Sequence, residues 1–293
     1  MNSIKKMMLS GALGCLISGM AYADGSSPQP AKPYWQDIQV VAVNKEKPRS
    51  SFMSYADRET ALTSRFEKSP YYSLLNGTWK FFFVDSYKDL PQNITDPSVN
   101  TSSWDDITVP GNWEVQGHGV AIYTNHGYEF KPRNPQPPLL PEANPVGVYR
   151  RDIEIPAGWD NRDIYLHIGG AKSGLYVYLN GKEVGYSEDS KNPAEFLINK
   201  YLQPGKNVLT LKIFRWSTGS YLECQDFWRM SGIERDVFLW SQPKASIQDF
   251  RVVSTLDDTY TNGIFKLAVD LKNHTQETKN LNVGYELLDA KGN

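Results

Sequence analysis

The strongest constraint on the fold is a β-hairpin signal in the middle of the chain. Residues 175–179 (LYVYL) and 183–186 (EVGY) are rich in aromatic and β-branched residues, and Asn180-Gly181-Lys182 separates them. An Asn-Gly pair tolerates the positive φ angles of a type I′ turn, which joins two antiparallel strands. The sequence therefore predicts a tight hairpin at this position.

Short runs of similar character recur along the chain and predict further strands. They share aromatic, β-branched or alternating residues and cover residues 79–84, 148–155, 163–168, 207–216, 245–255, 263–271 and 281–288. Pro204-Gly205-Lys206-Asn207 predicts a second turn, and residues 57–66 predict a short helix. Many short strands separated by Gly, Pro and Asn are typical of an all-β sandwich, which is the fold class that we expect.

The first 23 residues have the layout of a secretory signal peptide. Lys5 and Lys6 precede a largely apolar run over residues 7–20, and Ala21-Tyr22-Ala23 matches a small-x-small cleavage site. The run is shorter than the ~20 residues that a membrane-spanning helix needs. Lipid attachment at Cys15 is an alternative, although it would leave a very short apolar stretch. We therefore expect export to the periplasm or out of the cell, with no membrane span in the mature chain.

The composition argues against several classes of function. The chain has 31 Lys and Arg against 33 Asp and Glu, and it has no long basic block. Phosphate binding needs clustered cations, so nucleic acid is not expected as a partner. The two cysteines are Cys15, which would leave with the signal peptide, and Cys224, so we expect no disulfide and no zinc site. The four histidines are scattered and match no metal motif.

Two aromatic-rich stretches carry polar groups suited to binding a ligand. Residues 215–233 interleave aromatic side chains with carboxylates and arginines, and residues 109–125 combine a strand end, a turn and amide groups. Aromatic faces stack on the C–H face of a sugar, while a few polar groups fix the orientation of its hydroxyls. From residue types alone, a packing role for these side chains is favoured.

No standard catalytic motif is convincing. Hydrolysis of a glycoside needs two carboxyl groups ~5 to 9.5 Å apart, and sequence spacing in a β-protein does not establish that distance. Glu188-Asp189 and the pair Glu223 and Asp226 are the carboxylates to consider, and we interpret Glu188 and Asp189 as loop residues. The glycine-rich residues 169–174 lack the spacing of a phosphate loop and predict a β-turn.

Five short blocks then occur in a characteristic order. They are LNGTWKF (75–81), VPGNWE (109–114), IYTN (122–125), LNGK (179–182) and WRMSGIERDV (228–237). In this order they resemble glycoside hydrolase family 2. The longer form of residues 221–228 (YLECQDFW) is similar to the large β-galactosidases rather than to β-glucuronidases. The resemblance runs from about Trp35 to the last residue.

The resemblance implies an order of domains. After the signal peptide (1–23) and a lead-in (24–50), a sugar-binding jelly-roll β-sandwich would occupy residues 51–243. Residues 244–293 would form the first strands of an immunoglobulin-like β-sandwich. Because such a domain needs ~7 strands over ~100 residues, we expect it to be incomplete here. The catalytic TIM barrel of the family is expected to be absent from this chain.

The resemblance also implies half of an active site. Asp226 matches a carboxylate that binds the galactosyl unit and a monovalent cation, typically sodium, and Asn125 matches an amide that helps to hold the sugar. Relatives often have Asp where this chain has Thr218, which argues against a second, structural divalent-cation site. Magnesium is possible through the missing barrel. No catalytic residue is expected in this chain, because the acid/base and nucleophile glutamates of the family lie in the barrel.

The expected function is the N-terminal carbohydrate-binding part of a retaining β-galactosidase that hydrolyses terminal β-D-galactosides. Its partners would be a β-galactoside and the family's catalytic barrel, with a homo-oligomer possible in the full-length form, and the chain alone is expected to be inactive. A stand-alone or remnant carbohydrate-binding module is the alternative, although a half-finished domain leaves strand edges uncovered. An adhesion or structural β-protein would keep the fold without needing Asn125 and Asp226.

Overall fold

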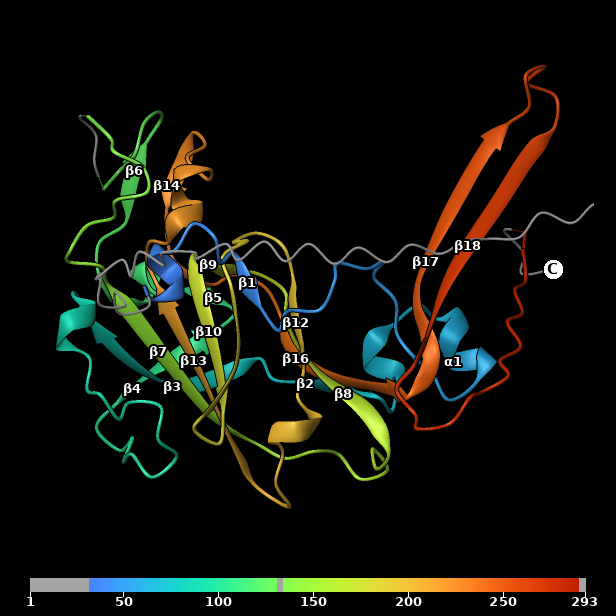
Figure 1. Ribbon diagram of the computed structural model, residues 1–293, viewed down its shortest axis with the longest axis horizontal. Helices are drawn as coiled ribbons and strands as arrows, with labels where there is room; N and C mark the ends of the chain where they lie inside the picture. The colour runs from blue at the N-terminus through green and yellow to red at the C-terminus, as the bar shows by residue number, and fades with distance from the viewer. Residues whose placement is uncertain (1–31, 131–133, 290–293) are drawn as a thin grey trace, which may run out of the picture. The chain divides into compact units, whose positions relative to one another are not determined.

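Most strands belong to two antiparallel sheets that pack against each other (Figure 1). The larger sheet has seven strands in the order β1 (Ala42–Val43), β11 (Lys182–Ser187), β10 (Gly174–Leu179), β13 (Asn207–Phe214), β7 (Val146–Ile153), β3 (Gly77–Val84) and β4 (Asp105–Val109). The smaller sheet has four strands in the order β12 (Ala194–Leu197), β8 (Arg162–Ile168), β16 (Val237–Pro243) and β2 (Tyr72–Leu74). The prediction of an all-β fold is therefore confirmed.

The computed structural model describes residues 32–130 and 134–289 of the chain. The predicted signal peptide at residues 1–23 lies outside the described residues. In the described part, no helix is long and apolar enough to cross a bilayer.

The hairpin predicted from the Asn-Gly pair is present. β10 and β11 pair antiparallel and end on Leu179 opposite Lys182. Asn180 and Gly181 have φ angles of 53° and 77°, as a type I′ turn requires. β3, β7, β8 and β13 confirm the strands predicted from the other runs, and the predicted helix is α1 (Arg58–Leu62), which begins after Asp57.

The core lies between the two sheets because alternate residues of each strand point inward. From β10, Leu175, Val177 and Leu179 are fully buried in it, and β8 contributes Ile164 and Leu166. Burying one such aliphatic side chain stabilises the fold by about 1.5–3 kcal/mol. Two layers of these residues therefore hold the sheets together.

The segment before the sandwich covers part of the outer face of each sheet. Trp35 is 1% exposed and stacks on Phe214 of β13, with ring centroids 5.0 Å apart. Met53 packs with Phe238 and Trp240 on the smaller sheet. Both sheets are thus partly buried on two faces, which explains why β7 and β13 carry few exposed residues.

Beyond the sandwich, β17 (Ala245–Leu256) and β18 (Gly263–Asn273) form a long hairpin whose strands pair only with each other among the described residues (Figure 1). Two of the three strands predicted here are therefore confirmed. The third is wrong, because residues 281–288 form no strand. Alternation predicts a strand only where a neighbour supplies ladder hydrogen bonds, and the described chain offers residues 281–288 no such partner.

Candidate functional site

The two residues singled out from the sequence come together on a short two-stranded ribbon (Figure 1). β6 (Ile122–Thr124) and β14 (Phe227–Arg229) pair antiparallel, with Thr124 opposite Phe227 and Tyr123 opposite Trp228. Asn125 directly follows β6 and Asp226 directly precedes β14, so both flank the last pair of this ladder, Thr124 and Phe227. We call this pair of strands with its two flanking residues the β6–β14 ribbon.

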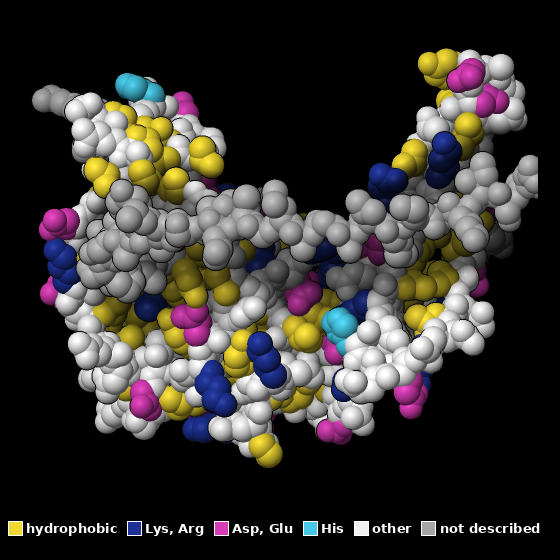
Figure 2. All heavy atoms as spheres, viewed as in Figure 1, with side chains coloured by type: hydrophobic (Ala, Val, Ile, Leu, Met, Phe, Trp, Pro, Cys, Tyr) yellow, Lys and Arg dark blue, Asp and Glu magenta, His cyan; other side chains and the backbone are white. Residues whose placement is uncertain are grey.

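One face of the β6–β14 ribbon is open to solvent. Because opposite residues of a ladder share a face, Tyr123 and Trp228 lie on the same side, and the Tyr123 hydroxyl donates to Asp226 there. Asn125 and Asp226 are exposed, and the rings of Tyr123 and Trp228 are 56% and 52% exposed with centroids 5.6 Å apart. Figure 2 shows hydrophobic side chains gathered over this part of the surface. Exposed aromatics beside an amide and a carboxylate are the groups that a sugar needs.

Few hydrogen bonds within the chain occupy this face. The Tyr123 hydroxyl donates to Asp226 Oδ1 over 2.9 Å, and this bond together with the carboxylate charge raises the pKa of Tyr123. Asn125 Oδ1 lies 2.6 Å from His126 Nδ1. The second Asp226 oxygen and the Asn125 amide nitrogen make no hydrogen bond within the described chain, so both remain free for a ligand.

The donor set on this face consists of oxygen atoms with one negative charge. Asp226, Asn125 and Tyr123 offer a carboxylate, an amide oxygen and a hydroxyl, which are ligands of hard cations. No group of three or more His, Cys, Asp or Glu suited to a metal occurs among residues 32–130 and 134–289. Asp226, Asn125 and Tyr123 therefore fit a hard cation by the chemistry of their oxygen atoms.

A buried arginine supports the β6–β14 ribbon from its other face. Arg229 is 1% exposed, and its guanidinium lies 3.4 Å from the Glu223 carbonyl and 3.5 Å from the Thr124 carbonyl, to which it donates. Its Nε lies 3.6 Å from Glu129 Oε2, while Glu129 Oε1 accepts from the Trp216 indole over 3.0 Å. Arg229 thus joins the backbone of β6, next to Asn125, to the loop that precedes Asp226.

A second buried ion pair lies behind the first. Arg215 Nη1 is 3.6 Å from Glu114 Oε1, and Arg215 Nη2 donates to the Arg229 carbonyl over 3.1 Å. Glu114 Oε2 accepts from the Ser231 amide over 2.8 Å. Burial raises the pKa of Glu114 and lowers the pKa of Arg215, because it penalises the charged form of each. These buried charges contact the backbone of the ribbon, but removing them from water costs free energy. Only pairing between opposite charges offsets that cost.

A pocket of about 350 Å³ borders the other side of β14. Phe227 lines it together with Lys172 and Glu223. Burial lowers the pKa of Lys172, and burial raises the pKa of Glu223 although Ser190 donates two hydrogen bonds to that carboxylate. The Glu223 carboxylate therefore has its partners inside the chain.

Glu188 also has its partners inside the chain. Glu188 follows β11 in a loop, as predicted, but it is buried. Its carboxylate accepts from the Tyr186 hydroxyl at 2.7 Å, from Thr218 Oγ1 at 2.8 Å and from the Gly219 amide at 2.7 Å. A carboxylate with three donors is a structural cross-link between this loop and residues 218–219.

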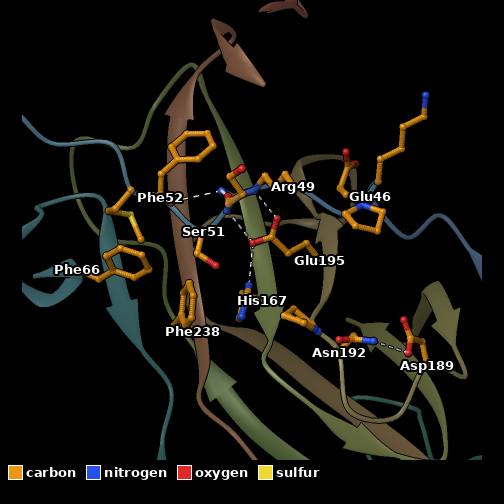
Figure 3. Close-up of a pocket in the computed structure, with 15 residues that line it drawn as sticks. Glu46, Arg49, Ser51, Phe52, Phe66, His167, Asp189, Asn192, Glu195 and Phe238 are labelled. Carbon is orange, nitrogen blue, oxygen red and sulfur yellow. Dashed lines mark hydrogen bonds and ion pairs between the residues drawn. The ribbon is translucent and has the colours of Figure 1, made fainter. Parts of the chain in front are cut away.

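A larger pocket of about 400 Å³ lies on the outer face of the smaller sheet (Figure 3). Arg49 donates from Nε and Nη2 to the two oxygens of Glu195, each over 2.9 Å, and His167 Nδ1 lies 2.7 Å from Glu195 Oε1. The Trp240 indole donates to the same oxygen over 3.1 Å. His167 stacks on Phe238 with centroids 4.2 Å apart. We call this set the Arg49–Glu195 clamp, and it fastens residues 46–53 to the sheet.

Sequence reasoning missed two kinds of residue at the site. Tyr123 and Trp228 lie inside blocks that were recognised, and the alternation Tyr123-Thr124-Asn125 already places Tyr123 on the face of Asn125. The buried support was not foreseen, because Arg229 and Glu129 meet only through long-range folding. An arginine and a glutamate in aromatic surroundings carry no local signal of a buried pair.

Comparison with known proteins relates the chain to a family of carbohydrate-binding domains. The family model described as "Glycosyl hydrolases family 2, sugar binding domain" matches residues 72–243. A beta-galactosidase of Priestia megaterium is 39% identical over 269 residues, which are 90% of this chain and 26% of that protein. A beta-galactosidase of Psychromonas ingrahamii is 36% identical over 88% of this chain and 24% of its own length. The chain thus spans about a quarter of the length of these curated relatives.

Solved structures share the fold. A beta-glucuronidase from an uncultured Clostridium species superposes with a TM-score of 0.51 at 23% identity, over 68% of this chain and 33% of that one. A beta-glycosidase from Bacteroides vulgatus gives a TM-score of 0.52 at 22% identity, over 70% of this chain and 25% of that one.

Proposed function

The chain belongs to family 2 of the glycosyl hydrolases and carries the sugar-binding domain of that family. We propose that it is the carbohydrate-binding part of a retaining β-galactosidase that acts on terminal β-D-galactosides. The observation that supports the proposal is the β6–β14 ribbon, where Asn125 and Asp226 flank the Thr124–Phe227 pair and Tyr123 donates to Asp226. The names of the relatives supply the substrate class, and the exposed face of the ribbon supplies groups suited to it.

In this proposal the ribbon binds and orients the sugar. The Asp226 carboxylate accepts hydrogen bonds from sugar hydroxyls, and the Asn125 amide both donates and accepts. The rings of Tyr123 and Trp228 give the apolar C–H face of the sugar a surface to rest on. Holding a substrate in one orientation lowers the entropic part of a reaction barrier, so such contacts raise a rate without taking part in bond breaking.

We propose sodium as the cation that accompanies the sugar. Asp226 would hold it, with oxygen atoms of Asn125 or Tyr123 and of the sugar nearby. A cation shared between the carboxylate and a sugar hydroxyl would fix the direction of that hydroxyl. We assign no residue of this chain to magnesium.

Bond cleavage itself is assigned to residues that this chain does not supply. A retaining glycosidase needs two carboxyl groups about 5 to 5.5 Å apart. The exposed face of the ribbon offers the single carboxylate of Asp226, whereas Glu188 and Glu223 are engaged inside the chain. We further propose that the chain is exported, on the strength of its first 23 residues.

Ligand-observed NMR tests the proposal on the 293-residue chain. Methyl β-D-galactoside should show saturation transfer in sodium buffer and a weaker signal when choline replaces sodium. Asp226→Asn should weaken binding about tenfold or more, because a hydrogen bond to a charged group contributes roughly 1.5–3 kcal/mol. Asp258→Asn is the matched control, since Asp258 is an exposed aspartate on the β17–β18 hairpin.

Each outcome decides one part of the proposal. Equal binding by the wild type and Asp226→Asn would remove Asp226 from the site. Binding that is the same in sodium and choline would keep the sugar site and remove the cation. The pure chain should release no product from a chromogenic β-galactoside, and turnover by the chain alone would show that its own carboxylates are catalytic.

A further inference from the structure

A second group of aromatic and charged side chains lies on the outer face of the larger sheet. Alternation turns Leu175 and Val177 of β10 into the core, so Tyr176 and Tyr178 point to the opposite face. On the neighbouring strand β13, the same face carries Lys212 and Phe214, with Tyr176 directly opposite Lys212. These side chains line a pocket of about 480 Å³, which we call the tyrosine pocket.

Three rings of the tyrosine pocket form an array with nearly parallel planes. Tyr34 stacks on Tyr176 with centroids 5.7 Å apart and planes 10° apart, and Tyr176 stacks beside Tyr178 at 6.5 Å and 13°. Tyr176 is buried, whereas Tyr34 and Tyr178 are half-buried and keep part of each ring accessible. The accessible parts of the Tyr34 and Tyr178 rings give the pocket an apolar surface.

An ammonium group lies over this array without a hydrogen-bonding partner. Lys212 Nζ is 4.7 Å from the ring centroid of Tyr176, 5.3 Å from that of Tyr178 and 5.7 Å from that of Phe214. In the described part of the chain, Lys212 Nζ makes no hydrogen bond and no ion pair. Aromatic faces attract a cation but leave its N–H donors unsatisfied. Burial also lowers the pKa of Lys212.

The Glu183 carboxylate also lines the tyrosine pocket. Glu183 on β11 is exposed and lies directly opposite Tyr178, whose hydroxyl donates to Glu183 Oε2 over 3.3 Å. The charge of Glu183 raises the pKa of Tyr34, so this carboxylate lies near both accessible rings. In the described part of the chain, Glu183 forms no ion pair with Lys212.

We propose that the tyrosine pocket is a second carbohydrate site, which takes one pyranose unit of an oligosaccharide. The C–H face of the sugar would lie on the rings of Tyr34 and Tyr178. Lys212 would donate to a sugar oxygen, and Glu183 would accept from a hydroxyl. None of the residues that line this pocket belongs to the β6–β14 ribbon, so the inference does not depend on the proposed function.

Other ligand classes fit the tyrosine pocket less well. A purely apolar ligand would bury the Lys212 ammonium without an acceptor, which is unfavourable. Nucleic acid would place a phosphate near Glu183 with a single lysine to neutralise it, whereas phosphate binding uses clustered cations. A polyhydroxylated ring satisfies the donor, the acceptor and the aromatic surface together.

Affinity electrophoresis of the whole chain tests the proposal, with soluble β-1,4-galactan, xyloglucan or mixed-linkage β-glucan cast separately into native gels. The chain should be retarded in at least one of them. Lys212→Met should reduce that affinity at least tenfold with an unchanged melting temperature, because it keeps the aliphatic stem against the rings. Lys206→Met is the control, since Lys206 is an exposed lysine paired with Asp152. Glu183→Gln gives a second, exposed test should Lys212→Met unfold the chain.

The result separates the two sites. Asp226→Asn should leave the retardation unchanged, while Lys212→Met should leave the sodium-dependent NMR signal of methyl β-D-galactoside unchanged. Migration unaffected by all three polysaccharides would overturn the proposal. So would retardation that Asp226→Asn abolishes and that Lys212→Met and Glu183→Gln do not alter.

Discussion

The β6–β14 ribbon and the Arg49–Glu195 clamp contain similar groups and differ in how those groups are satisfied. In the clamp, Glu195 is 8% exposed and accepts hydrogen bonds from Arg49, His167 and Trp240. In the ribbon, the exposed Asp226 accepts a single hydrogen bond, from Tyr123. A carboxylate beside aromatic rings is therefore no sign of a binding site by itself.

The difference shows what separates a structural carboxylate from one suited to binding. Burial makes the charge of Glu195 costly, and only the partners around it offset that cost. Asp226 avoids the cost by staying in water, so it contributes little to folding and keeps an oxygen for a ligand.

Removing the clamp carboxylate should have the largest effect on stability. Glu195→Ala leaves the Arg49 guanidinium without its partner, and breaking a buried pair in this way costs about 3–5 kcal/mol. Urea denaturation monitored by tryptophan fluorescence measures the change. Glu142→Ala removes an exposed ion pair with Lys88 and should cost at most about 1 kcal/mol. A loss below about 1 kcal/mol for Glu195→Ala would erase the distinction between the two regions.

The Arg49–Glu195 clamp should also make the free energy of unfolding depend on pH in the acid range, whereas the ribbon should not. Burial raises the pKa of Glu195, but hydrogen bonds from His167 and Arg49 and the charges of both outweigh burial, so the folded pKa lies below the ordinary 4.5. As the pH falls, Glu195 therefore takes up its proton at a higher pH in the unfolded state than in the folded state. Stability from Glu195 is complete above about pH 4.5 and is lost as the pH falls through the folded value.

Unfolding free energies at several pH values test this sign. The difference between the wild type and Glu195→Gln should be constant near neutral pH and should shrink below about pH 4.5, since glutamine does not titrate. A difference that grows on acidification would mean that Glu195 is destabilised by its surroundings. In that case the clamp would be a strained site rather than a structural one.

Local patterns predicted local structure and left long-range pairing undetermined. The prediction of a turn at Asn180-Gly181 was correct, because its φ angles depend on those two residues alone. The strand expected at 281–288 was wrong, because a strand also needs a neighbour. Glu195 on β12 lies directly opposite His167 on β8. Nothing in the sequence of either strand predicts that these two residues pair. Asn125 and Asp226 were selected through family resemblance, and their places beside the same end of one ribbon became visible only in the structure.

The smallest effect is expected from the hydroxyl of Tyr123, and it probes the ribbon most closely. Tyr123→Phe keeps the ring beside Trp228 and removes the one hydrogen bond that Asp226 accepts. Because both side chains are exposed, stability should change by no more than about 0.5 kcal/mol in urea denaturation. Galactoside binding should change only a few fold, since water can replace the lost donor. A loss of stability as large as that of Glu195→Ala would mean that the Tyr123–Asp226 contact is structural, and Asp226 would then belong with Glu195 rather than with the sugar.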